Sequence, residues 1–223
     1  PPTRGLSRPK KRGRPEQQGS AVMSIASVVD YGVGNLFSMT NALRKTGLIV
    51  EVVKDPGKIE PTDAIILPGV GNFGAAADKL RVFKEPILKE IENGTPILGS
   101  CLGMQLLFEE SEESSGEGLR LLGGWVRRFT GNLKVPHMGW NMIRALRDSP
   151  LLEDIPDNTY FYFVHSFYPF PADPRVVLAV TEYGVEFTSI VEKDQVYGTQ
   201  FHPEKSGQAG ATLLHNFSRI IRR

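Results

Sequence analysis

The sequence predicts an α/β fold with an open, three-layer sheet that is mostly parallel in its N-terminal half and gains mixed or antiparallel strands in its C-terminal half. Between residues 24 and 101, short apolar runs alternate with helical patterns, which is typical of a parallel sheet covered on both faces. Between residues 123 and 200, short strand-like runs predominate. The 223 residues are enough for one sizeable domain and few for two.

The first half shows the clearest alternation of strands and helices. Asn35 is expected to cap a helix that ends at Gly47. A second helical pattern covers residues 73–92, and Pro86 must kink or split it. Apolar, often β-branched runs predict strands at 25–29, 48–53, 64–67 and 96–100.

The second half is predicted to add strands to the sheet and to end in a helix. The last helix, 209–221, places Leu214, Phe217 and Ile221 on one face and should therefore pack on the core. The expected strands are 125–129, 160–164, 176–181, 187–191 and 196–201.

Composition excludes several classes of protein. The formal net charge of +1 argues against a dedicated polyanion binder, so no nucleic-acid partner is expected. The single cysteine rules out an internal disulfide and raises the question of a thiol nucleophile. No apolar run approaches the roughly 20 residues that span a bilayer, and no secretory signal is recognisable. A cytoplasmic protein without membrane contact is predicted.

Residues 1–22 differ from the rest of the chain. They are rich in Pro, Gly, Arg and Lys, with almost nothing apolar to bury, which predicts a disordered basic tail. Met23 precedes the first apolar run, so we interpret it as the native start and the tail as a vector-derived extension. The alternative is that Arg12-Gly13-Arg14-Pro15 inserts into a DNA minor groove, but a four-residue motif occurring once is weak support.

The motif Gly99-Ser100-Cys101-Leu102-Gly103 follows an apolar strand and precedes an apolar helical pattern. This is the G-x-C-x-G form of a nucleophile elbow, in which glycines let strand and helix approach closely around a strained nucleophile. A helix N-terminus at Cys101 would favour a thiolate and offer N–H groups to an oxyanion. The alternative is a buried structural cysteine at a helix start, and the motif alone leaves the two readings nearly even.

A second motif, Gln200-Phe201-His202-Pro203-Glu204, follows the strand at 196–201. His202 and Glu204 lie two residues apart, so in extended geometry both side chains emerge on one side. A carboxylate beside an imidazole can fix its tautomer and stabilise its protonated form. The alternative is a solvated turn with an incidental histidine.

A third motif, Leu67-Pro68-Gly69-Val70-Gly71-Asn72, lies at the end of the strand at 64–67. Two glycines around Val70 make a peptide that can reorient and present its N–H to a carbonyl under attack. The alternative is a plain turn. Neither this motif nor Gly32-Val33-Gly34 has the full pattern of a dinucleotide site, and no metal-ligand spacing is recognisable, so no cofactor or metal is expected.

Together, the stretches PGVGNF at 68–73, GSCLGMQ at 99–105 and QFHPEKSG at 200–207 resemble the class I (triad) glutamine amidotransferases, which have a flavodoxin-like core. The resemblance covers essentially 24–221 and implies one type 1 amidotransferase domain over 23–223. DYGVGN at 30–35, PHMGWN at 136–141 and Lys205-Ser206-Gly207 are similar to the glutaminase subunits of imidazole glycerol phosphate synthase. Ser100 stands where the family often has an aliphatic residue.

The resemblance implies a residue-by-residue assignment of the site. Catalysis would use Cys101 as nucleophile on glutamine, His202 as proton shuttle and Glu204 as its orienting acid. The oxyanion hole would be formed by the N–H of Leu102 and a peptide N–H at Val70 and Gly71. Gln105, Glu113 and the backbone of His165 and Ser166 would bind L-glutamine. Asn35, Trp140 and Lys205 would face the partner.

The partner implied by the resemblance is a separate (βα)8-barrel synthase subunit, which takes up the ammonia to make imidazole glycerol phosphate in histidine biosynthesis. Two other functions remain open on sequence grounds: a class I glutaminase that feeds a different synthase, and a cysteine peptidase or hydrolase on a similar sheet. His137 is compatible with a core or an interface position, and His215 with the surface.

Overall fold

The computed structural model describes residues 23–222, and the tail predicted at 1–22 lies outside this range. Its largest sheet has eight strands in the order β2-β1-β3-β4-β13-β12-β11-β8. Five strands are parallel: β2 (Ile49–Val53), β1 (Ile25–Val29), β3 (Ala64–Leu67), β4 (Ile97–Ser100) and β13 (Val196–Thr199). The other three continue the sheet in antiparallel pairing: β12 (Glu186–Lys193), β11 (Val177–Glu182) and β8 (Arg144–Ala145).

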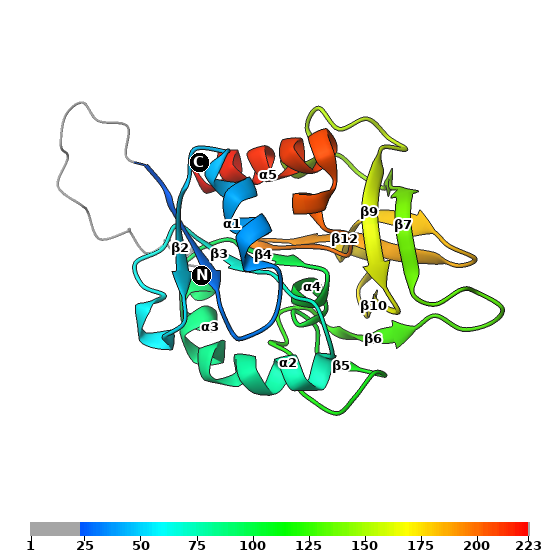
Figure 1. Cartoon of the computed structure of the whole chain (residues 1–223), viewed down its shortest axis with the longest axis horizontal. Coiled ribbons are helices and arrows are strands. Elements are labelled where there is room, and N and C mark those ends of the chain that lie inside the picture. Colours follow the sequence, from blue (N-terminus) through cyan, green and yellow to red (C-terminus); the bar gives the residue numbers. More distant parts are fainter. Residues whose placement is uncertain (1–22, 223) are drawn as a thin grey trace, which may run out of the picture.

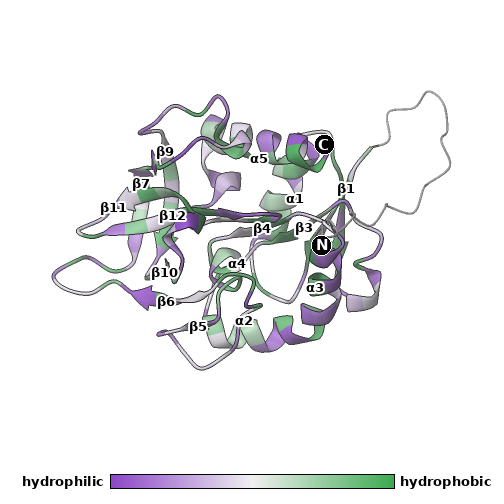
Figure 2. Cartoon of the chain, turned by 180° about the vertical axis from the view of Figure 1, so that it is seen from behind, coloured by the Kyte–Doolittle hydropathy of each residue, from purple (hydrophilic) through white to green (hydrophobic). Residues whose placement is uncertain are grey.

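Helices cover both faces of the parallel strands (Figure 1). One face carries α1 (Leu36–Arg44) and α5 (Gly207–Ile221), and the other carries α2 (Phe73–Leu80) and α3 (Lys84–Glu92). The strands are buried on both sides because their residues alternate between two cores: Ile65 packs with the α2 side and Ile66 with the α1 side. Strand β3 is coloured hydrophobic between these helical layers (Figure 2). The predicted three-layer fold is thereby confirmed.

Two smaller sheets lie beside the antiparallel strands of the large sheet. Strand β10 (Phe167–Pro171) pairs with β6 (Gly124–Arg128), which also pairs with the short β5 (Glu110–Ser111). Strand β7 (His137–Met142) pairs with β9 (Tyr160–His165) in a separate two-stranded sheet, and these two strands form the β7–β9 ribbon. The sequence predicted β6 and β9 but not β7 or β10.

The long helical pattern is split as predicted, although the break does not fall at Pro86. A 3-10 turn at Arg81–Phe83 separates α2 from α3, and Pro86 lies in the first turn of α3. The N–H groups of a first turn have no intrahelical acceptor, so proline is tolerated there. No helix in the range 23–222 is both long and apolar enough to cross a membrane.

Candidate active site

Cys101 lies directly after β4 and adopts φ 54° and ψ −111°, a backbone conformation that is rare for any residue except glycine. The glycines around it are needed for close packing. A Cβ on Gly103 would fall on the Leu67 carbonyl oxygen, and a Cβ on Gly99 would clash with the Gly103 backbone. The strained cysteine and its tightly packed neighbours have the geometry of a nucleophile elbow.

The helix that follows Cys101 is a single turn, α4 (Leu102–Gln105), which is shorter than the apolar sequence pattern through Phe108 suggested. Residues 106–108 continue as a buried turn instead. Cys101 is 6% exposed. Its sulfur lies 3.8 Å from the Val164 carbonyl oxygen and 3.7 Å from Nε2 of Gln200, which donates to it.

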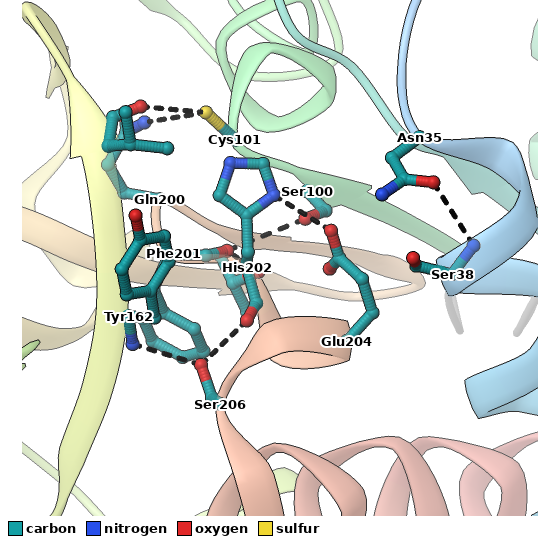
Figure 3. A network of polar contacts seen from close by, with 12 residues as sticks. Asn35, Ser38, Ser100, Cys101, Tyr162, Gln200, Phe201, His202, Glu204 and Ser206 are labelled. Atoms are coloured by element: carbon teal, nitrogen blue, oxygen red, sulfur yellow. Dashed lines mark hydrogen bonds and ion pairs between the residues drawn. The ribbon is translucent and has the colours of Figure 1, made fainter. Parts of the chain in front are cut away.

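His202 and Glu204 meet in a turn rather than in the extended segment that the sequence predicted. Pro203–Lys205 form a 3-10 turn, and it brings Oε1 of Glu204 to 2.9 Å from Nδ1 of His202. The two side chains are 2% and 3% exposed. Figure 3 shows the His202 ring between the Cys101 sulfur and the Glu204 carboxylate. Ser206 fixes the turn, donating to the His202 carbonyl at 2.6 Å and accepting from the Tyr162 N–H at 3.0 Å.

The charge state of His202 follows from these neighbours. Burial alone lowers the pKa of His202, but its interactions with Cys101 and Glu204 outweigh burial and raise the pKa from 6.5 to about 9. At neutral pH the arrangement therefore favours a protonated His202 imidazole facing the Cys101 sulfur. A histidine placed in this way can activate a cysteine nucleophile.

The segment that was predicted to supply an oxyanion donor lies against the elbow. A Cβ on Gly69 would come within 2.9 Å of the Gly103 nitrogen and of the Leu102 Cβ. The Tyr31 hydroxyl donates to the Pro68 carbonyl at 2.6 Å and anchors the start of the segment. Gly71 has a φ of +117°, and nothing lies within 4 Å of the position that a Cβ would take, so this residue can adopt backbone conformations that other residues rarely reach.

The residues predicted to bind glutamine occupy different parts of this region. Gln105 is buried, and its Nε2 donates to the Phe167 carbonyl at 3.0 Å and to Oε1 of Gln200 at 3.2 Å. Glu113 accepts from the Phe73 N–H at 2.7 Å, at the start of α2 just beyond the oxyanion segment. His165 and Ser166 lie at the end of β9, next to Val164, whose carbonyl faces the Cys101 sulfur.

The three residues predicted to face a partner are all exposed. Trp140 on β7 is 55% exposed, and Asn35 caps α1 by accepting from the Ser38 N–H. Lys205 follows Glu204 in the 3-10 turn and makes no ion pair with any residue from 23 to 222.

Residues 23–222 contain no group of three His, Cys, Asp or Glu side chains that could hold a metal ion.

Gln200 is the residue of the site that sequence reasoning missed. It contacts both Gln105 and Cys101, which lie 95 and 99 positions away in the sequence. A local signal was available, because Gln200 belongs to the strand predicted at 196–201 and lies two residues before His202. Residues two apart in a strand share a face.

Comparison with known proteins defines the class of protein. The family model "Glutamine amidotransferase class-I" matches residues 27–220. The chain therefore belongs to the class I glutamine amidotransferases, enzymes that hydrolyse glutamine.

Individual relatives show which members of this family the chain resembles. The imidazole glycerol phosphate synthase subunit HisH of Methanothermobacter thermautotrophicus is 52% identical over 197 residues, which are 88% of this chain and 98% of that protein. The HisH subunit of Halobacterium salinarum is 46% identical over 209 residues, 90% of this chain and 94% of that protein. Among solved structures, PurLQS from Thermotoga maritima superposes with a TM-score of 0.74 at 22% identity, covering 89% of this chain and 99% of that one. That likeness concerns the fold alone.

Proposed function

We propose that the chain is the glutamine-hydrolysing subunit of an imidazole glycerol phosphate synthase and supplies ammonia to a separate (βα)8-barrel subunit in histidine biosynthesis. The observation that carries the proposal is the only cysteine of the chain, held in a strained elbow beside the buried His202–Glu204 pair. The similarity to HisH subunits over 88% of the chain selects this synthase among those that class I amidotransferases serve.

The proposed reaction has two steps. The Cys101 thiolate attacks the side-chain carboxamide carbon of glutamine, and the C–N bond breaks as His202 gives its proton to the departing ammonia. A glutamyl thioester remains on Cys101. Water then attacks the thioester while His202 takes a proton from it, the C–S bond breaks, and glutamate and the thiolate are released. Glu204 keeps the imidazole oriented and stabilises its charged form in both steps.

In the tetrahedral intermediates, the oxygen of the attacked carbonyl carries a negative charge that hydrogen-bond donors must stabilise. The first donor is assigned to the N–H of Leu102, the residue at which α4 begins directly after Cys101. A second donor is assigned to the peptides around Val70 and Gly71. One such donor is typically worth about 10²–10³ in rate. Gln105, Glu113 and the backbone at His165 and Ser166 form the proposed glutamine pocket around them.

The proposed partner surface is the outer face of the β7–β9 ribbon together with Asn35 and Lys205. Side chains on alternate positions of both strands point outward, and they form an apolar patch that a single soluble chain seldom leaves uncovered. The exposed residues of this patch are Met138, Trp140, Met142 and Tyr160. Its position fits a barrel subunit that receives ammonia from Cys101, because the Val164 carbonyl on the same ribbon contacts the sulfur.

A separation-of-function experiment tests the proposal. In the complex reconstituted with the barrel subunit, Cys101→Ala should abolish glutamine-dependent synthesis, since no other thiol in the chain can form the thioester. Synthesis from added ammonium should continue at the wild-type rate, because that chemistry takes place on the partner. Loss of ammonium-dependent synthesis in an intact complex, or glutamine hydrolysis by the variant, would contradict the proposal.

A further inference from the structure

A continuous chain of hydrogen bonds connects strand β7 with the Cys101 sulfur. It begins at Asn141, whose amide orientation is fixed because Oδ1 accepts from the Met142 N–H at 2.8 Å and Nδ2 donates to the Glu182 carbonyl at 2.9 Å. The second hydrogen of Nδ2 faces Nε2 of His137 at 3.3 Å. An amide nitrogen only donates, so Nε2 of His137 must be the acceptor.

The direction of every later bond follows from that first one. His137 must carry its proton on Nδ1, which lies 3.0 Å from Nε2 of His165. His165 in turn must carry its proton on Nδ1, which donates to the Phe167 carbonyl at 2.8 Å. Both rings are buried, and burial lowers the pKa of His137 to about 4 and of His165 to about 3. Both histidines are therefore neutral at physiological pH, as a chain with one donor per ring requires.

The Phe167 carbonyl is the junction between this chain and the site. Its oxygen also accepts from Nε2 of Gln105 at 3.0 Å, and the other hydrogen of that nitrogen goes to Oε1 of Gln200 at 3.2 Å. The amide of Gln200 is thereby oriented with Nε2 toward the Cys101 sulfur, at 3.7 Å. If the Gln200 amide were turned by 180°, an oxygen would face the thiolate and repel it.

We infer that Asn141, His137 and His165 are positioning residues that hold the Phe167 carbonyl, and through it the Gln105 and Gln200 amides, in the one orientation that presents an N–H to the Cys101 sulfur. The proposed function assigns β7 a second role, because Met138 and Trp140 lie on the opposite face of the strand that carries His137 and Asn141. The inference rests on the proposed function only where it connects β7 with a partner subunit. The hydrogen bonds themselves lie within this chain.

The wild-type protein provides the first test. Nitrogen-15 NMR of the imidazole rings distinguishes a proton on Nδ1 from one on Nε2. The inference expects neutral His137 and His165 with the proton on Nδ1 in both, at pH 7. A proton on Nε2 of either ring would reverse the chain and overturn the inference.

Two substitutions of His165 separate positioning from packing. His165→Phe keeps an aromatic ring against Phe129 and Phe187 but removes both hydrogen bonds, whereas His165→Asn keeps a donor near the Nδ1 position and loses the ring. The readout is the rate at which iodoacetamide alkylates Cys101, the only thiol of the chain. We expect His165→Phe to slow alkylation about tenfold, the effect of losing one hydrogen bond to a charged group, and His165→Asn to recover part of that loss. If the phenylalanine variant is the more reactive of the two, His165 only fills space.

A second variant lies at the surface end of the chain and avoids the core. Asn141→Asp places an acceptor opposite Nε2 of His137, which draws the proton away from Nδ1; Asn132→Asp makes the same charge change on an exposed loop residue and serves as the matched control. We expect Asn141→Asp alone to slow alkylation and to raise the KM for glutamine of the complex. Equal behaviour of the two variants would overturn the inference. Alkylation reports on it even if the chain did not hydrolyse glutamine, so failure of the proposed function would be recognised separately.

Discussion

The charge on His202 is the residue-level property on which the mechanism depends. The pKa of His202 is about 9 in the folded chain, against the 6.5 of an unperturbed histidine. Protonation of His202 therefore stabilises the folded state fully below about pH 6.5, and this contribution is lost as the pH rises through about 9. The His202 imidazolium should accordingly persist through the neutral range.

Substitution of the triad acid tests this charge state. Glu204→Gln keeps the shape of the side chain but removes the carboxylate 2.9 Å from Nδ1. We expect the pKa of His202, followed by NMR titration, to fall, and kcat for glutamine hydrolysis to fall by roughly 10²–10⁴. Glu153→Gln, which alters an exposed surface pair with Arg219, is the control. An unchanged His202 titration in Glu204→Gln would mean that the carboxylate does not set the charge on the ring.

Sequence motifs predicted a triad of Cys101, His202 and Glu204, and the structure places His202 and Glu204 in contact. They did not predict every residue around these three. Cys101, His202 and Glu204 lie in short motifs whose chemistry can be read locally. The prediction of an extended His202–Glu204 segment was wrong because Pro203 takes the first position of a 3-10 turn, where its fixed φ is favourable. The contacts of Gln200 with Gln105 and Cys101 join segments almost a hundred residues apart. The position of Gln200 two residues before His202 could place it near the site, but no local pattern indicates which distant residues it contacts.

At the level of elements, the elbow depends on backbone packing between β3, β4 and α4. A Cβ on Gly103 has no free space beside the Leu67 carbonyl, so Gly103→Ala should destabilise the fold by about 2–4 kcal/mol in denaturant unfolding. Gly94→Ala is the matched control: its φ is +89° but nothing lies within 4 Å of the added Cβ, so only a conformational cost of about 1–2 kcal/mol is expected. Equal losses in the two variants would show that the close approach at the elbow is not limiting.

Whether a strand could be predicted from the sequence depended on its amino-acid composition. Strands β1 to β4 were placed within a residue of their observed bounds because they are largely apolar runs, as is typical of strands buried on both faces. Strand β10 contains Pro169 and Pro171, and β7 contains Gly139 with a φ of +135°. Proline and glycine are typical of turns and edge strands, so the sequence pattern did not indicate β7 and β10, the two strands that carry His137 and Phe167.

For the molecule as a whole, the account predicts a subunit that is slow on its own. Gly71 has a positive φ within the proposed oxyanion segment, and Trp140 and Lys205, the proposed contacts with the partner, are exposed. Glutamine turnover should rise by roughly 10²–10³ when the barrel subunit and its ligand are added, the effect of gaining one oxyanion donor. Lys205→Ala should blunt the rise, whereas Lys58→Ala, in the turn after β2, should not. Full activity of the isolated chain would indicate an oxyanion hole already formed at rest.

The central claim is that glutamine is hydrolysed through a thioester on Cys101, and trapping that intermediate tests it most directly. The wild-type complex would be quenched in acid during turnover, digested, and the peptide containing Cys101 examined by mass spectrometry; a parallel reaction would contain hydroxylamine. The account predicts a glutamyl adduct on Cys101 and diversion of product to γ-glutamyl hydroxamate. Glutamate formed at the full rate with neither the adduct nor the hydroxamate would contradict it.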